Sequence, residues 1–217
     1  MEGKALKRRG IFITLEGNEG CGKSTQIKLL FEHLQKEGRR VFSTREPGGT
    51  KLGDEIRALL LDPKHKQMSP VTETFLYMAS RAQLVAEVIS PRLKNGEIVI
   101  CDRWLDATVA YQGYAGGLDI RWIRELGRAA TRGVSPDLSL YLDLPVKAGL
   151  ARAKKSHRAD RIEQKPVSFH EKVRKGFLAI AKAEPKRFHR LPLSLQESPM
   201  EVHERIKLEV HRVLSKR

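Results

Sequence analysis

Short runs of consecutive apolar residues alternate along the chain with longer stretches in which apolar residues recur every three or four positions. The short runs are rich in branched side chains and predict buried β-strands at residues 11–15, 40–44, 97–101, 138–142 and 188–193. The longer stretches predict helices at residues 23–37, 51–61, 71–94, 119–132, 145–154, 168–183 and 199–214. Strands that alternate with helices predict an α/β fold, in which a central five-stranded parallel sheet is covered by helices on both faces.

The length of 217 residues fits one domain that can bury its own core. Residues 1–9 are expected to form a basic N-terminal tail, and residues 10–217 the single domain. Between residues 155 and 166 charge replaces periodicity, which predicts a lid over approximately residues 152–166. No apolar run approaches the ~20 residues of a membrane span, and no secretory signal is present, so we expect a cytoplasmic protein.

The formal net charge of +15 favours partners that carry negative charge. The basic residues are densest at residues 1–9 and 152–190. A nucleic-acid-binding face is one interpretation, but these stretches lack the interleaved aromatic pattern of a base-stacking surface. A face that attracts small phosphates is the favoured interpretation, and nucleic acid is not expected as a partner.

The cysteines and histidines give no sign of a metal centre in the sequence. Cys21 and Cys101 form no C-x-x-C pair, and the seven histidines show no ligand spacing. We therefore expect no disulfide and no structural metal, and surface or packing roles for the histidines.

A glycine-rich segment joins the first predicted strand to the first predicted helix. Residues 17–24 match G-x-x-x-x-G-K-[ST], whose glycines let backbone N–H groups and the positive helix end face phosphate oxygens. Lys23 is expected to reach the β and γ phosphates of ATP, and the Ser24 hydroxyl to bind Mg2+. A glycine-rich turn that matches by chance is the alternative. The predicted ATP-binding residues are Gly17, Asn18, Glu19, Gly20, Cys21, Gly22, Lys23, Ser24 and Thr25.

Charged residues follow two further predicted strands. Asp102 ends the run of residues 98–101 and is predicted to lie beside the first strand, where a carboxylate can hold Mg2+ or its water. Arg45 and Arg103 would project at the same carboxyl edge of the sheet, where a guanidinium is suited to bind phosphate. A helix cap for the aspartate and ordinary salt bridges for the arginines are the alternatives.

Five segments together form a more specific pattern. They are the phosphate-binding loop with Glu19 inside it, Thr44-Arg-Glu-Pro-Gly-Gly-Thr50, residues 77–81, Asp102-Arg103 followed by residues 110–113 (Ala-Tyr-Gln-Gly), and residues 160–163 (Asp-Arg-Ile-Glu). With these segments the chain resembles the bacterial type of thymidylate kinase, from Gly10 onward. The resemblance implies a P-loop three-layer α/β/α sandwich with a short lid, ATP as phosphoryl donor with Mg2+, and a homodimer formed through residues 71–94.

The resemblance also implies how the two phosphorylated substrates are held. Arg45 and Arg103 would grip the 5′-phosphate of thymidine monophosphate (dTMP), with Arg57 nearby. Glu19 would lie close to the sugar 3′-hydroxyl and to this acceptor phosphate. Lys23, Glu19, Arg103 and a cation of the lid are therefore the expected catalytic residues.

For the nucleoside, the resemblance implies four contacts and one supporting residue. Tyr77 would stack on thymine, Arg81 would donate to its O4 carbonyl, and Thr108 would sit near the base edge. Tyr111 would press against the 2′ carbon and exclude a ribose hydroxyl, with Gln112 supporting this wall. The alternative for both tyrosines is a core position on a helical face.

The lid departs from the family pattern. The usual Arg-Gly pair before residues 160–163 is absent, so the catalytic lid cation is expected to be Arg158, with Arg161 and then Lys155 as alternatives. Phe177 stands where the family usually has a tyrosine.

The leading hypothesis is transfer of the γ-phosphoryl group of ATP to dTMP, giving dTDP and ADP for dTTP and DNA synthesis. Such transfer depends on alignment and charge neutralisation, and needs no general base because the attacking phosphate oxygen is already ionised. The alternatives are the same chemistry on another nucleoside monophosphate, a nucleic-acid-dependent ATPase, and a regulatory module that binds ATP without transfer.

Overall fold

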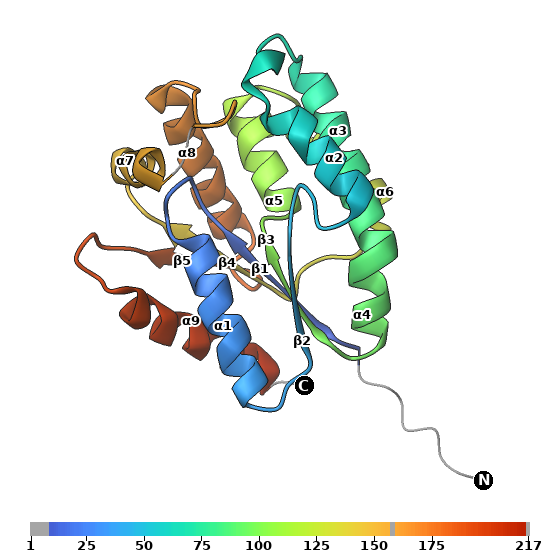
Figure 1. Cartoon of the computed structure of the whole chain (residues 1–217), viewed down its shortest axis with the longest axis vertical. Helices are drawn as coiled ribbons and strands as arrows, with labels where there is room; N and C mark the ends of the chain where they lie inside the picture. The colour runs from blue at the N-terminus through green and yellow to red at the C-terminus, as the bar shows by residue number, and fades with distance from the viewer. Residues whose placement is uncertain (1–8, 157–158, 216–217) are drawn as a thin grey trace.

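The computed structural model describes residues 9–156 and 159–215, and in them five parallel strands form one sheet in the order β2-β3-β1-β4-β5 (Figure 1). The five-stranded parallel α/β fold predicted from the sequence is confirmed. The strands are β1 (Ile11–Glu16), β2 (Val41–Arg45), β3 (Ile98–Asp102), β4 (Leu138–Asp143) and β5 (Phe188–Pro192).

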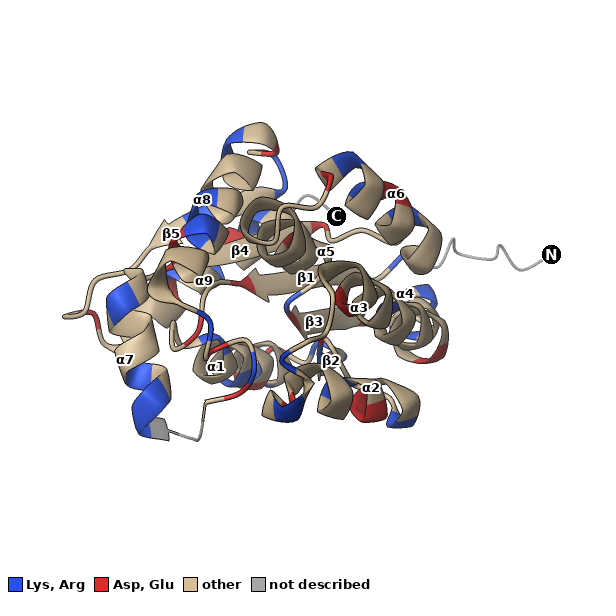
Figure 2. Ribbon diagram, turned by 90° about the horizontal axis from the view of Figure 1, so that it is seen from above, with Lys and Arg blue, Asp and Glu red and all other residues tan. Residues whose placement is uncertain are grey.

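Helices connect consecutive strands and cover the sheet on both faces (Figures 1 and 2). Among the described residues, no helix combines the length and the apolar character that a membrane span needs. The α-helices are α1 (Lys23–Lys36), α2 (Lys51–Leu61), α3 (Pro70–Leu84), α4 (Ser90–Lys94), α5 (Leu105–Thr108), α6 (Ile120–Thr131), α7 (Val146–Ser156), α8 (Val167–Ala183) and α9 (Pro199–Leu214).

The long helix predicted at residues 71–94 is continuous but not uniform. A π-helical turn at Val85–Ile89 joins α3 to α4 without leaving the right-handed helical region. A helical segment that the sequence did not predict follows β3, in which α5 continues into a second π-helical stretch, Val109–Ala115. The wider π turns shift apolar residues off the period of 3.6, which hides this segment from a periodicity analysis.

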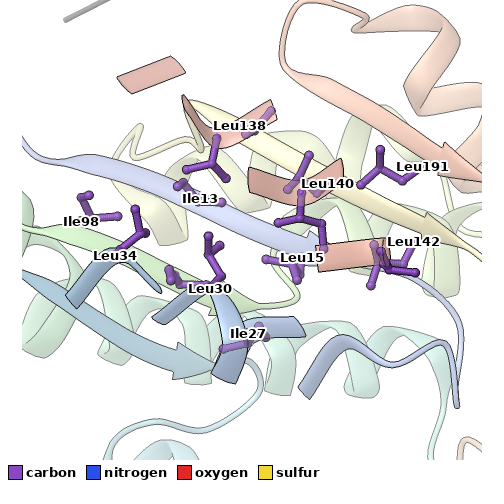
Figure 3. Close-up of a cluster of buried hydrophobic side chains, with 14 of the residues drawn as sticks. Ile13, Leu15, Ile27, Leu30, Leu34, Ile98, Leu138, Leu140, Leu142 and Leu191 are labelled. Atoms are coloured by element: carbon purple, nitrogen blue, oxygen red, sulfur yellow. The ribbon is translucent and has the colours of Figure 1, made fainter. Parts of the chain in front are cut away.

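Successive side chains of β1 point to opposite faces of the sheet, and both faces are buried, so the strand is almost entirely apolar in sequence. Ile13 and Leu15 face α1 and α9, in a cluster that includes Leu30 and Leu34 of α1 (Figure 3). Phe12 points to the opposite face and packs edge-on against Trp104, with 4.9 Å between ring centroids. A parallel strand buried on both faces has no polar side to reveal its period.

The position of β1 fixes where a ligand can bind. The strand lies between β3 and β4, whose chain connections run to opposite sides of the sheet. Ligands of open α/β sheets bind beyond the carboxyl ends of the strands at such a point. The loop that follows β1 is the segment with the predicted phosphate-binding pattern.

Candidate active site

The loop between β1 and α1 has the backbone of an anion-binding turn. Gly17, Gly20 and Gly22 have φ angles of 149°, 67° and 93°, a region in which only glycine is unstrained. Gly22 is the N-cap of α1, so the free N–H groups of the first helical turn point toward the loop. This geometry suits a phosphate, because the backbone donors and the helix dipole act on the same anion.

Lys23 closes this loop from inside. Its side chain is buried, and Nζ donates to the carbonyl oxygens of Gly17 at 3.0 Å and Asn18 at 3.2 Å. The ammonium group is therefore held above the loop by its own backbone. A positive charge in this position can serve the terminal phosphates of a bound nucleotide.

A cleft of about 580 Å³ opens at the carboxyl edge of the sheet and brings most of the predicted residues together. Gly17, Asn18, Cys21 and Arg161 do not line it, and Arg158 lies outside the described residues. The predicted residues that line the cleft are Glu19, Gly20, Gly22, Lys23, Ser24, Thr25, Arg45, Arg57, Tyr77, Arg81, Asp102, Arg103, Thr108, Tyr111 and Gln112.

Asp102 ends β3 and Arg103 follows it, directly beside the phosphate-binding loop. Asp102 pairs in register with Leu15 of β1 and Arg45 of β2, which places it at the centre of this edge. One buried oxygen of Asp102, Oδ1, has no hydrogen-bond partner among the described residues. Arg103 has φ 71°, a left-handed conformation that costs free energy for a residue with a side chain, and such strain concentrates at functional sites.

Glu19 is the centre of a buried polar cluster in the cleft. The Tyr111 hydroxyl donates to Glu19 Oε1 at 2.6 Å, and Arg103 Nη2 donates to the same oxygen at 3.0 Å. The buried ring of His170 lies with Nδ1 3.2 Å from Glu19 Oε2. Burial raises the pKa of Glu19, but His170, Arg103 and Lys23 favour the carboxylate more strongly and bring the pKa below its usual range.

Arg103 keeps donor capacity for a ligand. Its Nη1 is buried and makes no hydrogen bond within the described part of the chain. Its guanidinium lies over the Tyr111 ring, with 5.0 Å from Cζ to the ring centroid. Burial lowers the pKa of Arg103, but Tyr111, Glu19 and Asp102 raise it further and keep the group charged. A held, charged guanidinium with a free N–H is suited to a phosphate oxygen.

Two more arginines line the cleft, Arg45 at the end of β2 and Arg57 on α2. Arg45 Nη2 donates to Asp54 Oδ1 at 3.1 Å, and this bond lowers the pKa of Asp54. Arg57 Nη1 donates to the carbonyl of Pro47 at 2.9 Å, and its burial, together with Arg45, lowers its pKa. Gly48 between them has φ 119°, a conformation that residues with a side chain rarely adopt, so this turn favours glycine.

Arg81 occupies a fully buried position at the far end of the cleft. Its Nη2 forms an ion pair with Glu46 and donates to Thr108 Oγ1 at 2.8 Å. Burial raises the pKa of Glu46, although Arg81 opposes this shift. The Nε–H of Arg81 is buried and has no partner among the residues described. Arg81 is therefore fixed by Glu46 and Thr108 and still has one donor to offer.

Tyr77 and Gln112 complete the walls around this end of the cleft. Tyr77 is half-buried in the cleft wall, and desolvation, helped by Glu73, raises the pKa of its phenol, so the ring is neutral. Gln112 Nε2 donates to Glu73 Oε1 at 2.6 Å. Gln112 is thus fixed by α3, in keeping with a supporting position behind Tyr111.

The structure gives Arg161 a different environment from the one that a lid cation needs. Its guanidinium pairs with buried Glu73, its Nε donates to Leu60 O at 2.7 Å, and its backbone N–H donates to Leu61 O at 3.0 Å. These contacts hold the Arg161 side chain against α2 and α3, so its guanidinium is already paired. Phe177, for its part, is a fully buried core residue stacked on Tyr141 with 4.8 Å between centroids.

Two residues of α7 belong to the site although the sequence analysis did not select them. Gly149 touches the phosphate-binding loop, because a Cβ on it would lie 2.3 Å from Glu19 O, and a Cβ on Gly20 would lie 2.0 Å from Gly149 O. Arg152, three residues later, is exposed and lines the cleft. The sequence did indicate that Gly149 and Arg152 share one face of a helix, because they are three positions apart in the helix predicted at residues 145–154.

The cleft thus has a phosphate-binding loop on one side and three arginines on the other, so two phosphorylated molecules can meet end to end. A parallel sheet of this strand order with such a cleft defines the class of P-loop phosphotransferases.

Comparison with known proteins narrows this class. The sequence model of the family described as Thymidylate kinase matches residues 15–206. A curated thymidylate kinase of Synechococcus sp. (strain JA-2-3B'a(2-13)) is 52% identical over 198 residues, which are 90% of this chain and 92% of the relative. One from Geotalea uraniireducens (strain Rf4) is 50% identical over 82% of this chain and 87% of its own length.

A solved structure, the thymidylate kinase from Ehrlichia chaffeensis, superposes with a TM-score of 0.75 at 34% identity. The superposition covers 95% of this chain and 99% of the other. The chain belongs to the thymidylate kinase family. The resemblance inferred from five sequence segments is therefore confirmed.

Proposed function

We propose that the protein transfers the γ-phosphoryl group of ATP to dTMP, giving dTDP and ADP. The observation that carries this proposal is the meeting of Lys23 and Arg103 in one cleft, with a loop suited to a triphosphate on one side and free guanidinium donors on the other. The nucleoside end of the same cleft supports thymine as the base. The product is a precursor of dTTP and so of DNA.

The reaction needs alignment more than covalent chemistry from the protein. An ionised oxygen of the acceptor 5′-phosphate attacks the γ-phosphorus, and the bond from the γ-phosphorus to the β–γ bridging oxygen breaks and leaves its electrons on ADP. Arg45, Arg57 and Arg103 hold the acceptor phosphate, and Lys23 neutralises charge on the β and γ phosphates. Glu19 fixes Arg103 and Tyr111 and lies near the sugar 3′-hydroxyl.

Ser24 and Asp102 fit a magnesium site. Ser24 offers a hydroxyl in the first turn of α1, and Asp102 offers a buried carboxylate oxygen that has no hydrogen-bond partner in the described part of the chain. Hard oxygen donors of this kind, completed by phosphate oxygens, are the ligands that Mg2+ prefers. When bound, Mg2+ would neutralise charge on the phosphates and help to orient them.

The lid cation is assigned to the segment before the anchored Arg161. Within this segment Arg152 lines the cleft, and Arg158 is the residue that the sequence analysis favoured as the catalytic lid cation. Arg161 and Lys155 rank behind them, because Arg161 is committed to Glu73 and Lys155 does not line the cleft. A cation from this segment would cover the transferring phosphoryl group and help to exclude water.

The nucleoside end selects the acceptor. Tyr77 offers its ring to thymine, and the free Nε–H of Arg81 offers a hydrogen bond to the O4 carbonyl. Thr108 orients Arg81 and lies near the base edge. The Tyr111 ring, which packs against Phe169 and Phe177, would occupy the space beside the 2′ carbon. Gln112, held by Glu73, would support this wall.

A homodimer formed through α3 is the proposed assembly. Phe75 of α3 is half-exposed and packs edge-on against Trp122 of α6, and Val71 on the same helix is also exposed. Exposed apolar side chains grouped on one helix face favour a protein contact. Sedimentation of the chain at several concentrations tests this assembly.

Transfer of label from [γ-32P]ATP to dTMP tests the proposed reaction. Lys23→Ala should lower kcat by at least about a hundredfold, because it removes the cation beside the transferring group. Lys28→Ala is the matched control, since Lys28 lies on the same helix with its side chain 77% exposed. Equal turnover by the two variants would contradict the role of the phosphate-binding loop.

A further inference from the structure

Three potential metal ligands meet at the end of α1 that lies away from the cleft. α1 begins at Lys23, and its last turn contains His33, followed by Glu37 as the C-cap. α9 runs beside α1 and brings His211 to the same place (Figure 1). None of these residues takes part in the phosphotransfer site.

The ligand atoms form a nearly equilateral triangle. His33 Nε2 lies 3.2 Å from His211 Nε2 and 3.1 Å from Glu37 Oε1, and His211 Nε2 lies 3.3 Å from the same oxygen. Ligands bound at 2.0–2.1 Å in a tetrahedral zinc site are about 3.3 Å apart. The triangle therefore has the size of one face of such a tetrahedron.

Hydrogen bonds explain this arrangement less well than a shared cation. Each Nε2 directs a single proton or lone pair in the plane of its ring, so it has one good direction for a partner. Three mutual contacts of nearly equal length cannot all follow these directions. An ion above the triangle accepts one lone pair from each of the three atoms at once.

The local charges also favour a cation. Glu37 sits at the C-terminal end of α1, where the helix dipole is negative and a carboxylate is unfavourable. His203 packs edge-on against His33, with 5.8 Å between ring centroids, and its buried Nδ1 has no partner within the described residues. Lys207, on the turn of α9 before His211, donates instead to Glu204 at 2.7 Å.

We propose that His33, Glu37 and His211 form a binding site for a divalent transition-metal ion of the zinc type, with water as the fourth ligand. Two imidazoles and one carboxylate suit Zn2+, whereas Mg2+ prefers oxygen ligands alone, so this site is distinct from that of the reaction. The side chains are 25%, 31% and 43% exposed, which leaves a path for the ion to enter.

A bound ion would link α1 to α9. His33 and His211 are separated by 178 positions, so the link closes a loop of most of the sequence. It would also hold the helix that carries Lys23 against α9. Sequence spacing could not show this site, because only His33 and Glu37 are near one another in the chain, and the expectation of no structural metal followed from that.

Zinc titration of the untagged, chelator-treated full chain against a chromophoric chelator tests the proposal. We expect one equivalent to bind, and a Tm rise of about 5 to 10 °C at 100 times Kd. Co2+ should give the visible absorption of a four-coordinate site. His211→Ala and Glu37→Gln should each weaken binding at least about tenfold, and at the same zinc concentration the Tm rise should fall to about half or less. Glu37→Gln keeps the side-chain shape and so guards against a folding defect.

His189→Ala is the matched control. His189 pairs with Glu209 of α9 at 2.8 Å. This is also a histidine–carboxylate contact, but it has only one histidine and lies outside the triangle. It should bind zinc as the unaltered chain does. Binding that is equal in His211→Ala, Glu37→Gln and the control would overturn the proposal, as would the lack of any binding to the unaltered chain at about 100 μM Zn2+.

Discussion

Arg103 donates to Glu19 inside the cleft, with 3.0 Å between Nη2 and Oε1, and the Tyr111 hydroxyl donates to the same carboxylate oxygen. The strained backbone of Arg103 and the phosphate-binding loop are thereby joined through one buried carboxylate. Glu19 thus fixes both the residue proposed to hold the acceptor phosphate and the residue proposed to exclude ribose.

The ionisation of Glu19 predicts a pH dependence of stability. Its folded pKa lies below its unfolded value, so its contribution is full above about pH 4.3 and declines as the pH falls toward the folded pKa. The gap in unfolding free energy between the unaltered chain and Glu19→Gln should be constant from pH 7 to pH 5 and shrink below about pH 4.3. Urea unfolding at a series of pH values measures it. A gap that does not change down to pH 3 would contradict the ionised state.

Arg81 is predicted to recognise the base through its free Nε–H. Arg81→Lys keeps a positive charge beside Glu46 but removes this donor, whereas alanine would leave Glu46 buried without its cation. Loss of the hydrogen bond should weaken dTMP binding by about 1 to 3 kcal/mol and leave the KM for ATP unchanged. Steady-state kinetics with each substrate varied decide this. Equal losses for both substrates would make Arg81 a structural residue.

The lid arginines are predicted to have two different roles, one in catalysis and one in stability. Arg152→Ala and Arg158→Ala should lower kcat with little change in the KM for dTMP, as expected of contacts made mainly in the transition state. Arg161→Ala should instead lower the Tm, because it leaves the Glu73 carboxylate buried without its guanidinium.

Kinetics and thermal unfolding of the three lid variants separate these roles. A selective kcat defect in Arg161→Ala, with both other variants normal, would move the catalytic role to Arg161.

Tyr111 is predicted to reject ribose with its ring and to hold Glu19 with its hydroxyl. Tyr111→Phe removes only the hydroxyl, so preference for deoxyribose should persist while activity falls. Tyr111→Ala removes the ring and should raise the relative use of ribothymidine monophosphate, since the steric and desolvation penalties disappear. The ratio of kcat/KM for the two nucleotides reports this. An unchanged ratio in active Tyr111→Ala would shift attention to Gln112.

The parallel sheet and the phosphate-binding loop followed from the sequence because their signals are local, whereas Tyr77, Arg81 and Tyr111 were expected only from the family resemblance. Buried strands are unbroken apolar runs, and the phosphate-binding loop and Arg45 to Gly49 are contiguous segments. The carboxylates that fix Arg81 and Arg161 were not selected, because Glu46 lies 35 positions from Arg81 and Glu73 is joined to Arg161 only by folding. The helical segment after β3 was missed for a different reason, its π-helical turns.

Release of ADP with a panel of nucleoside monophosphates tests the central claim most directly. The panel contains dTMP, dUMP, dCMP, dAMP, dGMP and UMP, and each is assayed with ATP and Mg2+, with and without single-stranded DNA. The proposed function predicts that dTMP gives the highest kcat/KM, that dTDP forms in equal amount with ADP, and that DNA has no effect. Release of ADP that depends on DNA, or a higher kcat/KM for another monophosphate, would contradict it.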